Sequence, residues 1–170
     1  AEVLQESMKK HQNFFSLKNS KTGKIERFIT VANIEAADNG ETILKGNQKV
    51  LYARLSDAKF FWENDIRLIQ KDGLDAWLGR LVNVTFHNKL GSQADKVTRD
   101  SALTKILAKR LLCDIEDAVK SANICKSDLA SEMVYEFPEL QGVMGRYYAL
   151  SAGYSQDVAK VCEDHYAPKG

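Results

Sequence analysis

Two short stretches near the start of the chain carry the apolar, β-branched and aromatic residues that favour strands, residues 12–18 and 26–34. The polar loop between them, residues 19–24, contains Gly23, which can take the positive φ that tight turns need. We therefore predict a β-hairpin, preceded by a helix over residues 2–10.

After a break at Asp38, Asn39 and Gly40, apolar residues recur at the spacing of an amphipathic helix. One helical pattern leads toward Arg54, and a second begins at the potential caps Ser56 and Asp57 and ends near residue 73. Further helices are predicted over residues 74–86, 92–111, 114–122, 127–137, 139–152 and 155–166, with start signals at Ser92, Asp114, Ser127, Pro138 and Ser155.

These patterns predict an α+β fold that is predominantly α. Residues 1–54 form a mixed α/β segment with a β-hairpin, and residues 55–170 form an all-helical bundle. The chain of 170 residues contains no internal repeat and no run of about eighteen apolar residues, which a membrane-spanning helix would need. The N-terminal residues lack the charged flank and following apolar stretch of a secretory signal. We therefore expect no membrane association and a cytoplasmic location.

The charge and cysteine content narrow the classes of partner. The net charge is +1, but Lys and Arg outnumber Asp and Glu by three in residues 1–60 and are outnumbered by three in residues 126–170. This gradient is weaker than the basic face of a dedicated nucleic-acid-binding protein. Three cysteines without a Cys-x-x-Cys pair indicate reduced, mostly buried thiols, with neither a metal site nor a redox couple.

The residue patterns of common catalytic sites are missing from the chain. A helical bundle rich in Asp invites comparison with metal-dependent HD phosphohydrolases, but none of His11, His87 and His165 is followed by Asp. No Gly-x-Ser-x-Gly motif is present, and the segment 45–49 lacks the length and the Lys-Ser/Thr end of a phosphate-binding loop. We therefore predict no catalytic residue and no metal ligand in this chain.

Two groups of cations are candidates for binding a polyanion or a protein partner. Lys96 and Arg99 are i, i+3 neighbours that can meet one phosphate or carboxylate together. The alternative is an internal ion pair with Asp95, Asp100 or Glu136, and Arg54 presents the same choice between a structural and a binding role.

The aromatic residues beside Arg146 form a third candidate, because an exposed ring next to a positive charge can stack on a base. Tyr147 continues an apolar helical stripe and is expected to face inward, which makes Tyr148 the freer candidate. Gly142 and Gly145, three residues apart, are expected to let another backbone approach one face of a helix closely.

Several segments, in their order and spacing, resemble the β subunit of the bacterial two-subunit glycyl-tRNA synthetase. The resemblance is carried by residues 7–15, 28–34, 46–51, 53–58, 90–92 with Asp95, Lys96 and Arg99, 125–129, 133–149, 158–159 and 165–168.

The resemblance implies a fragment of a larger enzyme. In that family the α subunit carries the aminoacylation core that uses ATP and magnesium, while the β subunit serves tRNA(Gly) recognition and assembly of a tetramer of two α and two β subunits. Residues 55–170 would then belong to a degenerate HD-like helical domain, with no cofactor of their own. Arg54, Lys96, Arg99, Arg146 and Tyr148 are the residues we expect to face tRNA or the α subunit. The alternatives are a metal-dependent HD-type phosphohydrolase and a pure protein-interaction module without RNA contact.

Overall fold

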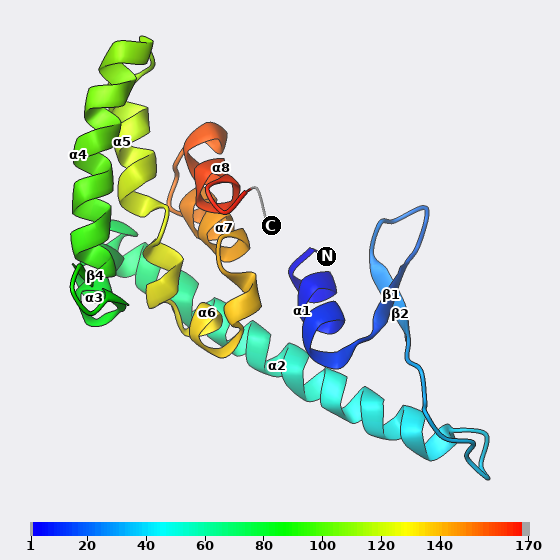
Figure 1. Cartoon of the computed structure of the whole chain (residues 1–170). Coiled ribbons are helices and arrows are strands. Elements are labelled where there is room, and N and C mark those ends of the chain that lie inside the picture. Colours follow the sequence, from blue (N-terminus) through cyan, green and yellow to red (C-terminus); the bar gives the residue numbers. More distant parts are fainter. Residues whose placement is uncertain (1, 168–170) are drawn as a thin grey trace. The chain divides into compact units, whose positions relative to one another are not determined.

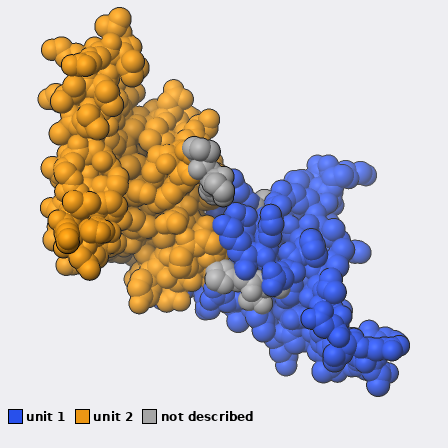
Figure 2. All heavy atoms as spheres, viewed as in Figure 1, with its two compact units in different colours: residues 1–61 blue, residues 62–170 orange. Residues whose placement is uncertain are grey.

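The computed structural model describes residues 2–167 and places them in two compact units, residues 1–61 and 62–170 (Figure 2). Pro168, quoted for the family resemblance, lies outside the described residues. Helices dominate both units, which confirms the predicted α+β, mostly α fold class.

The first unit contains the predicted hairpin. Helix α1 (Glu2–Gln12) precedes strands β1 (Phe15–Lys18) and β2 (Ile25–Ile29), which pair antiparallel with Phe15 opposite Ile29. The connecting turn uses Gly23 at a φ of 67°. The second strand ends at Ile29 rather than at residue 34, because its partner strand begins at the residue opposite.

Helix α2 (Glu41–Asp72) is continuous, and this corrects the prediction of two helices (Figure 1). Asp38 caps its start by accepting hydrogen bonds from the backbone N–H groups of Gly40 (3.1 Å) and Thr42 (2.9 Å). Ser56 and Asp57 lie exposed in the middle of this helix. A residue that can cap a helix does not interrupt it when the helical periodicity of the sequence continues. The boundary between the two compact units falls inside this helix, after Phe61.

After the last residues of α2, the second unit continues with α3 (Asp75–Arg80) and the 3₁₀ helix η1 (Leu81–Asn83), followed by the short antiparallel strands β3 (Thr85–His87) and β4 (Gly91–Ser92). The prediction of an all-helical bundle was therefore wrong at this point. Val84 is already extended, at φ −98° and ψ 109°, in a stretch whose β-branched residues favour strand geometry.

The remaining elements are helical: α4 (Gln93–Leu111), α5 (Ile115–Ile124), η2 (Ser127–Ala130), α6 (Glu132–Glu136), η3 (Pro138–Leu140), α7 (Val143–Ser151) and α8 (Gln156–Asp164). The predicted caps Ser92, Asp114 and Ser155 are confirmed by hydrogen bonds from backbone N–H groups. None of the described helices is both long and apolar enough to cross a membrane.

The predicted helices over 127–137 and 139–152 are shorter than expected. Ser131 is extended at ψ 151°, so it separates η2 from α6 and caps α6 in place of Ser127. Gly142 has a φ of 83°, so α7 starts only after it. The core of this unit is built from large, fully buried side chains, among them Trp77, Leu81, Phe137, Met144 and Tyr148.

Candidate functional site

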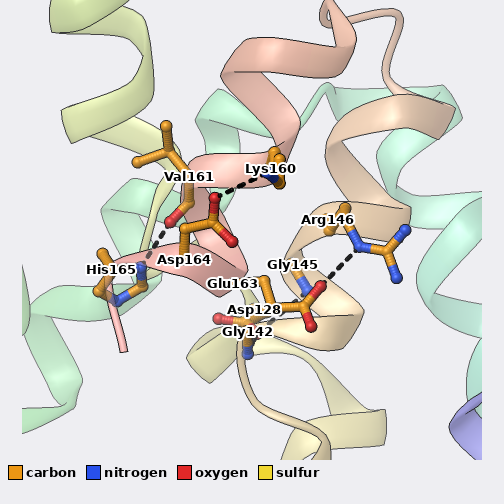
Figure 3. Close-up of polar contacts among 9 residues, drawn as sticks. All are labelled: Asp128, Gly142, Gly145, Arg146, Lys160, Val161, Glu163, Asp164 and His165. Atoms are coloured by element: carbon orange, nitrogen blue, oxygen red, sulfur yellow. Dashed lines mark hydrogen bonds and ion pairs between the residues drawn. The ribbon is translucent and has the colours of Figure 1, made fainter. Parts of the chain in front are cut away.

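A buried carboxylate lies at the centre of the segment that carries the resemblance. Asp128 is fully buried in η2, and its Oδ2 accepts hydrogen bonds from the backbone N–H groups of Gly142 (2.5 Å) and Gly145 (3.1 Å), as Figure 3 shows. These amides belong to the first turn of α7, where backbone N–H groups have no partner within the helix. Since Gly142 has no side chain, Asp128 caps this helix from a distant position in the sequence.

The same two glycines lie against α8. A Cβ added to Gly142 would be 2.9 Å from the carbonyl oxygen of Cys162 and 2.8 Å from the ring of Tyr166, and one added to Gly145 would be 2.9 Å from the Cβ of Cys162. This close approach confirms the role predicted for the glycine pair. It allows α7 to pack closely on α8 beside the buried Asp128.

Burial dominates the ionisation of Asp128. It raises the pKa of this carboxyl to about 6, against the opposing effect of the two amide hydrogen bonds. The second oxygen, Oδ1, is also buried and has no hydrogen-bond partner among the described residues. The site thus favours the protonated form of Asp128 over the ionised form more than a surface site would.

We expect the stability of the second unit to fall as the pH rises from about 4 to about 6. In this window folded Asp128 still holds its proton, whereas the unfolded residue, with a pKa near 3.8, has released it. The unfolded state binds fewer protons, so the free energy of unfolding decreases, by at most about 3 kcal/mol. Urea unfolding followed by tryptophan fluorescence measures this, because both tryptophans, Trp62 and Trp77, lie in this unit.

An Asp128→Asn variant separates this effect from the titration of other carboxylates. Its side chain has nearly the same shape and no charge, so the variant should lose less stability than the wild type over the same pH range. Parallel stability curves for the two proteins would show that Asp128 keeps an ordinary pKa.

A second buried carboxylate, Asp65 on α2, organises the other side of this unit. It accepts hydrogen bonds from the backbone N–H groups of Glu132 and Met133, both at 3.0 Å, and from the hydroxyl of Tyr148 at 2.6 Å. Asp65 therefore caps α6 as Asp128 caps α7. Burial raises the pKa of Asp65, and it also raises that of Tyr148, which keeps its proton and donates it.

Tyr148 is a core residue, which corrects the prediction that it is the freer of the two tyrosines. It is completely buried, with its ring stacked on Trp62 at a centroid distance of 5.4 Å and in edge contact with Trp77 at 5.2 Å. A side chain held in this way is not available to stack on a base. Tyr147 is only partly buried, and the guanidinium of Arg146 lies 4.7 Å from the centroid of its ring.

Arg146 is held within the second unit. Its Nε donates to a carboxylate oxygen of Glu163 on α8 at 2.8 Å (Figure 3), and both side chains are partly buried. Together with the glycine contacts, this ion pair joins α7 to α8.

Lys96 and Arg99 differ in their surroundings although both lie on α4. The Lys96 ammonium pairs with Asp100, one of the partners considered for it, and lies 5.6 Å from the centroid of the Phe86 ring. Arg99 is exposed and makes no ion pair with a described residue. Asp95 caps α4, and hydrogen bonds from Ser92, helped by the charge of Arg99, lower the pKa of Asp95.

Arg54 belongs to the first unit, whereas the other candidate residues belong to the second. It is partly buried within α2 and takes part in an interaction with another residue of the chain. The structure thus gathers Arg146 and Tyr148 on α7 and Lys96 and Arg99 on α4, and leaves Arg99 as the most exposed cation of the set.

The two buried thiols, Cys125 and Cys162, and the last histidine are in environments that favour their neutral forms. Burial raises the pKa of Cys162 to about 12 and lowers that of His165, whose Nδ1 lies 2.8 Å from the carbonyl oxygen of Val161. Cys125 is also buried, while Cys113 is exposed. Within residues 2–167, no three His, Cys, Asp or Glu side chains are grouped as a metal site would require.

The two buried carboxylates, Asp65 and Asp128, were not singled out in the sequence. Asp65 carried a usable signal, since it lies four residues from both Phe61 and Ile69 and therefore on an apolar helical stripe. For Asp128, the only hint was its place in the segment that also contains the two glycines.

Fold and site together define a mostly helical protein whose buried carboxylates cap helices and join them into one unit. The sequence matches the family described as "Glycyl-tRNA synthetase beta subunit" over residues 1–170. The chain belongs to this family.

Relatives named "Glycine--tRNA ligase beta subunit" show the same relationship. The chain is 62% identical to the one from Ruegeria sp. (strain TM1040) over 170 residues, and 58% identical to the one from Dinoroseobacter shibae over 169 residues. With the one from Neisseria meningitidis serogroup C the identity is 42% over 168 residues. Each alignment covers 99% of this chain but only 25%, 23% and 24% of the respective relative, so the chain spans about a quarter of their length.

Proposed function

We propose that this region works within a glycine–tRNA ligase, where it supports tRNA(Gly) recognition and assembly with the catalytic α subunit. The match to the β-subunit family along the whole chain is the observation that carries this proposal. ATP and magnesium would be used through the α subunit in a cytoplasmic enzyme of two α and two β subunits. The absence of a catalytic site from residues 1–170 stays a prediction.

The proposal assigns residues 55–170 to a degenerate HD-like helical domain that acts as a scaffold. The interactions of this region support a structural role, since Asp65, Asp128 and Arg146 all join helices to one another. The comparisons do not favour the alternative of a metal-dependent phosphohydrolase. A protein-interaction module without RNA contact remains the competing function, supported by the exposed apolar residues of α4 and α5.

Arg99 is the residue of the predicted set that best fits contact with a phosphate. It is exposed on α4, and the two carboxylates nearest in sequence are already engaged, Asp95 in the helix cap and Asp100 with Lys96. An exposed guanidinium that forms no ion pair with a described residue can contribute to the electrostatic part of tRNA binding.

We expect Arg99→Glu in the full-length, assembled enzyme to weaken tRNA(Gly) binding by about tenfold. The plot of log K against log salt concentration should also become less steep, its slope falling in magnitude by about one. The physical reason is the loss of one phosphate contact with its released counterion. Fluorescence anisotropy with labelled tRNA over a series of salt concentrations measures both quantities.

Lys105→Glu is the matched control. Lys105 is also exposed on α4, and six residues turn it about 120° around the helix axis from Arg99. The two variants have the same net charge, so an equal effect of both would indicate a general field rather than a contact. Unchanged tRNA binding by a correctly assembled Arg99→Glu enzyme would favour the protein-interaction module.

A further inference from the structure

A groove of about 540 Å³ lies over α5, between α4 and α8. Helix α5 packs against α4 and α8 (Figure 1). Its residues Ala118 and Ala122 line the groove. Leu103 and Leu107 of α4 form one wall, and Val161 of α8 lines the other. The small alanine side chains and larger apolar walls leave room for the side chains of another segment.

Helix α4 also exposes apolar side chains outside the groove lining, as far as its C-cap. Ile106, Leu111 and Leu112 are 56%, 71% and 93% exposed, and Leu103 and Leu107 are about half exposed. Several exposed apolar side chains on one helix are typical of a surface that another element covers. Leu112 also has a φ of 56°, a left-handed conformation that costs a residue with a side chain roughly 1–2 kcal/mol and that glycine adopts freely. A leucine here therefore points to a use for its side chain.

The charged residues that line the groove are Lys96, Asp100 and Lys126. Asp100 pairs with Lys96, so one lysine charge is compensated. The Lys126 ammonium lies 3.8 Å from the centroid of the Tyr166 ring and makes no ion pair with a described carboxylate. The carboxylates of Asp128 and Asp100 act on this ammonium without forming an ion pair with it, so the half-buried group is suited to accept a further carboxylate.

We propose that this groove binds an amphipathic segment of the same β subunit that lies outside residues 1–170, with apolar side chains against Leu103 and Leu107 and a carboxylate against Lys126. The full-length relatives have about three quarters of their residues outside the region matched here, which supplies such segments. A covalently linked segment binds at high effective concentration, so a groove of this modest size is sufficient. The apolar wall fits a peptide better than the backbone of RNA.

Carbodiimide cross-linking of the full-length, assembled enzyme tests the proposal, since this reagent joins a lysine to a carboxylate only when the two are in direct contact. Peptide mapping should find Lys126 joined to an Asp or Glu outside residues 1–170 of the same chain. Mixing ¹⁵N-labelled and unlabelled β subunits before assembly distinguishes a cross-link within one chain from one between two copies.

Leu107→Glu should lower the yield of this cross-link at least tenfold, because it places a charge in the apolar wall. Leu107 is half exposed, so the variant is expected to fold, and circular dichroism checks this. Lys105→Glu places a glutamate on another face of α4, with a larger change in net charge, and should leave the yield unchanged. A cross-link from Lys126 to the α subunit or to a second copy, or none outside residues 1–170, overturns the proposal. None of these results depends on the outcome for Arg99 and tRNA.

Discussion

Asp65→Ala is expected to lower the free energy of unfolding of the second unit by about 3–5 kcal/mol, since each buried donor left without an acceptor costs roughly 1–3 kcal/mol. Three donors lose their acceptor: the backbone N–H groups of Glu132 and Met133 and the hydroxyl of Tyr148. Helix α6, only five residues long, is then capped only by Ser131, which accepts from the N–H group of Val134. Urea unfolding monitored by the fluorescence of Trp62 and Trp77 measures the change.

Two further variants define the origin of this effect. Asp72→Ala removes an exposed carboxylate from the same helix and should change stability by no more than about 0.5 kcal/mol. Tyr148→Phe keeps the ring between the two tryptophans and removes only the hydroxyl, so it should cost about 1–2 kcal/mol. Equal urea midpoints for Asp65→Ala and Asp72→Ala would contradict the role assigned to Asp65.

Gly142→Ala is expected to destabilise the second unit by about 3 kcal/mol, through two separate causes. The positive φ of 83° costs a residue with a Cβ roughly 1–2 kcal/mol. The new methyl group would also lie 2.8 Å from the ring of Tyr166 and 2.9 Å from the carbonyl of Cys162, and such overpacking typically costs about 1–3 kcal/mol. Thermal and urea unfolding of the purified variant give the total.

Gly153→Ala separates the two causes. Gly153 has nearly the same φ, 87°, but a Cβ there would meet no atom within 4 Å, so the variant should show only the conformational cost. Gly79→Ala, in α3 with ordinary φ and open space, should be neutral or stabilising by up to about 1 kcal/mol. If Gly142→Ala and Gly153→Ala lost the same stability, the close packing of α7 on α8 at Gly142 would be refuted.

These predictions depend on contacts that local patterns do not report. Asp65 and Tyr148 are 83 residues apart in sequence, and Asp128 is 17 residues from Gly145. A periodicity argument placed Tyr147 inward and Tyr148 outward, because it considered one helix without its neighbours. In the folded unit, Trp62 of α2 and Trp77 of α3 enclose Tyr148, so tertiary packing reversed the order.

Local chemistry was reliable where it was sufficient by itself. Ser92, Asp114 and Ser155 cap helices as predicted, because a cap requires only a side chain and the backbone two or three residues later. The same reasoning failed at Ser56 and Ser127. At Ser56 the helix simply continues, and at Ser127 the chain forms a short 3₁₀ turn before Ser131 supplies the cap.

The sequence by itself determined the mostly helical α+β class, the N-terminal hairpin, the close approach at Gly142 and Gly145, and the resemblance to the glycyl-tRNA synthetase β subunit. These properties follow from neighbouring residues and from motif order. Only the tertiary structure decided that α2 is continuous, that Asp65 and Asp128 cap distant helices, and that Tyr148 is buried while Arg99 is exposed. The physical reason is that burial and remote hydrogen bonds depend on which elements pack together, and no local pattern of residues specifies that.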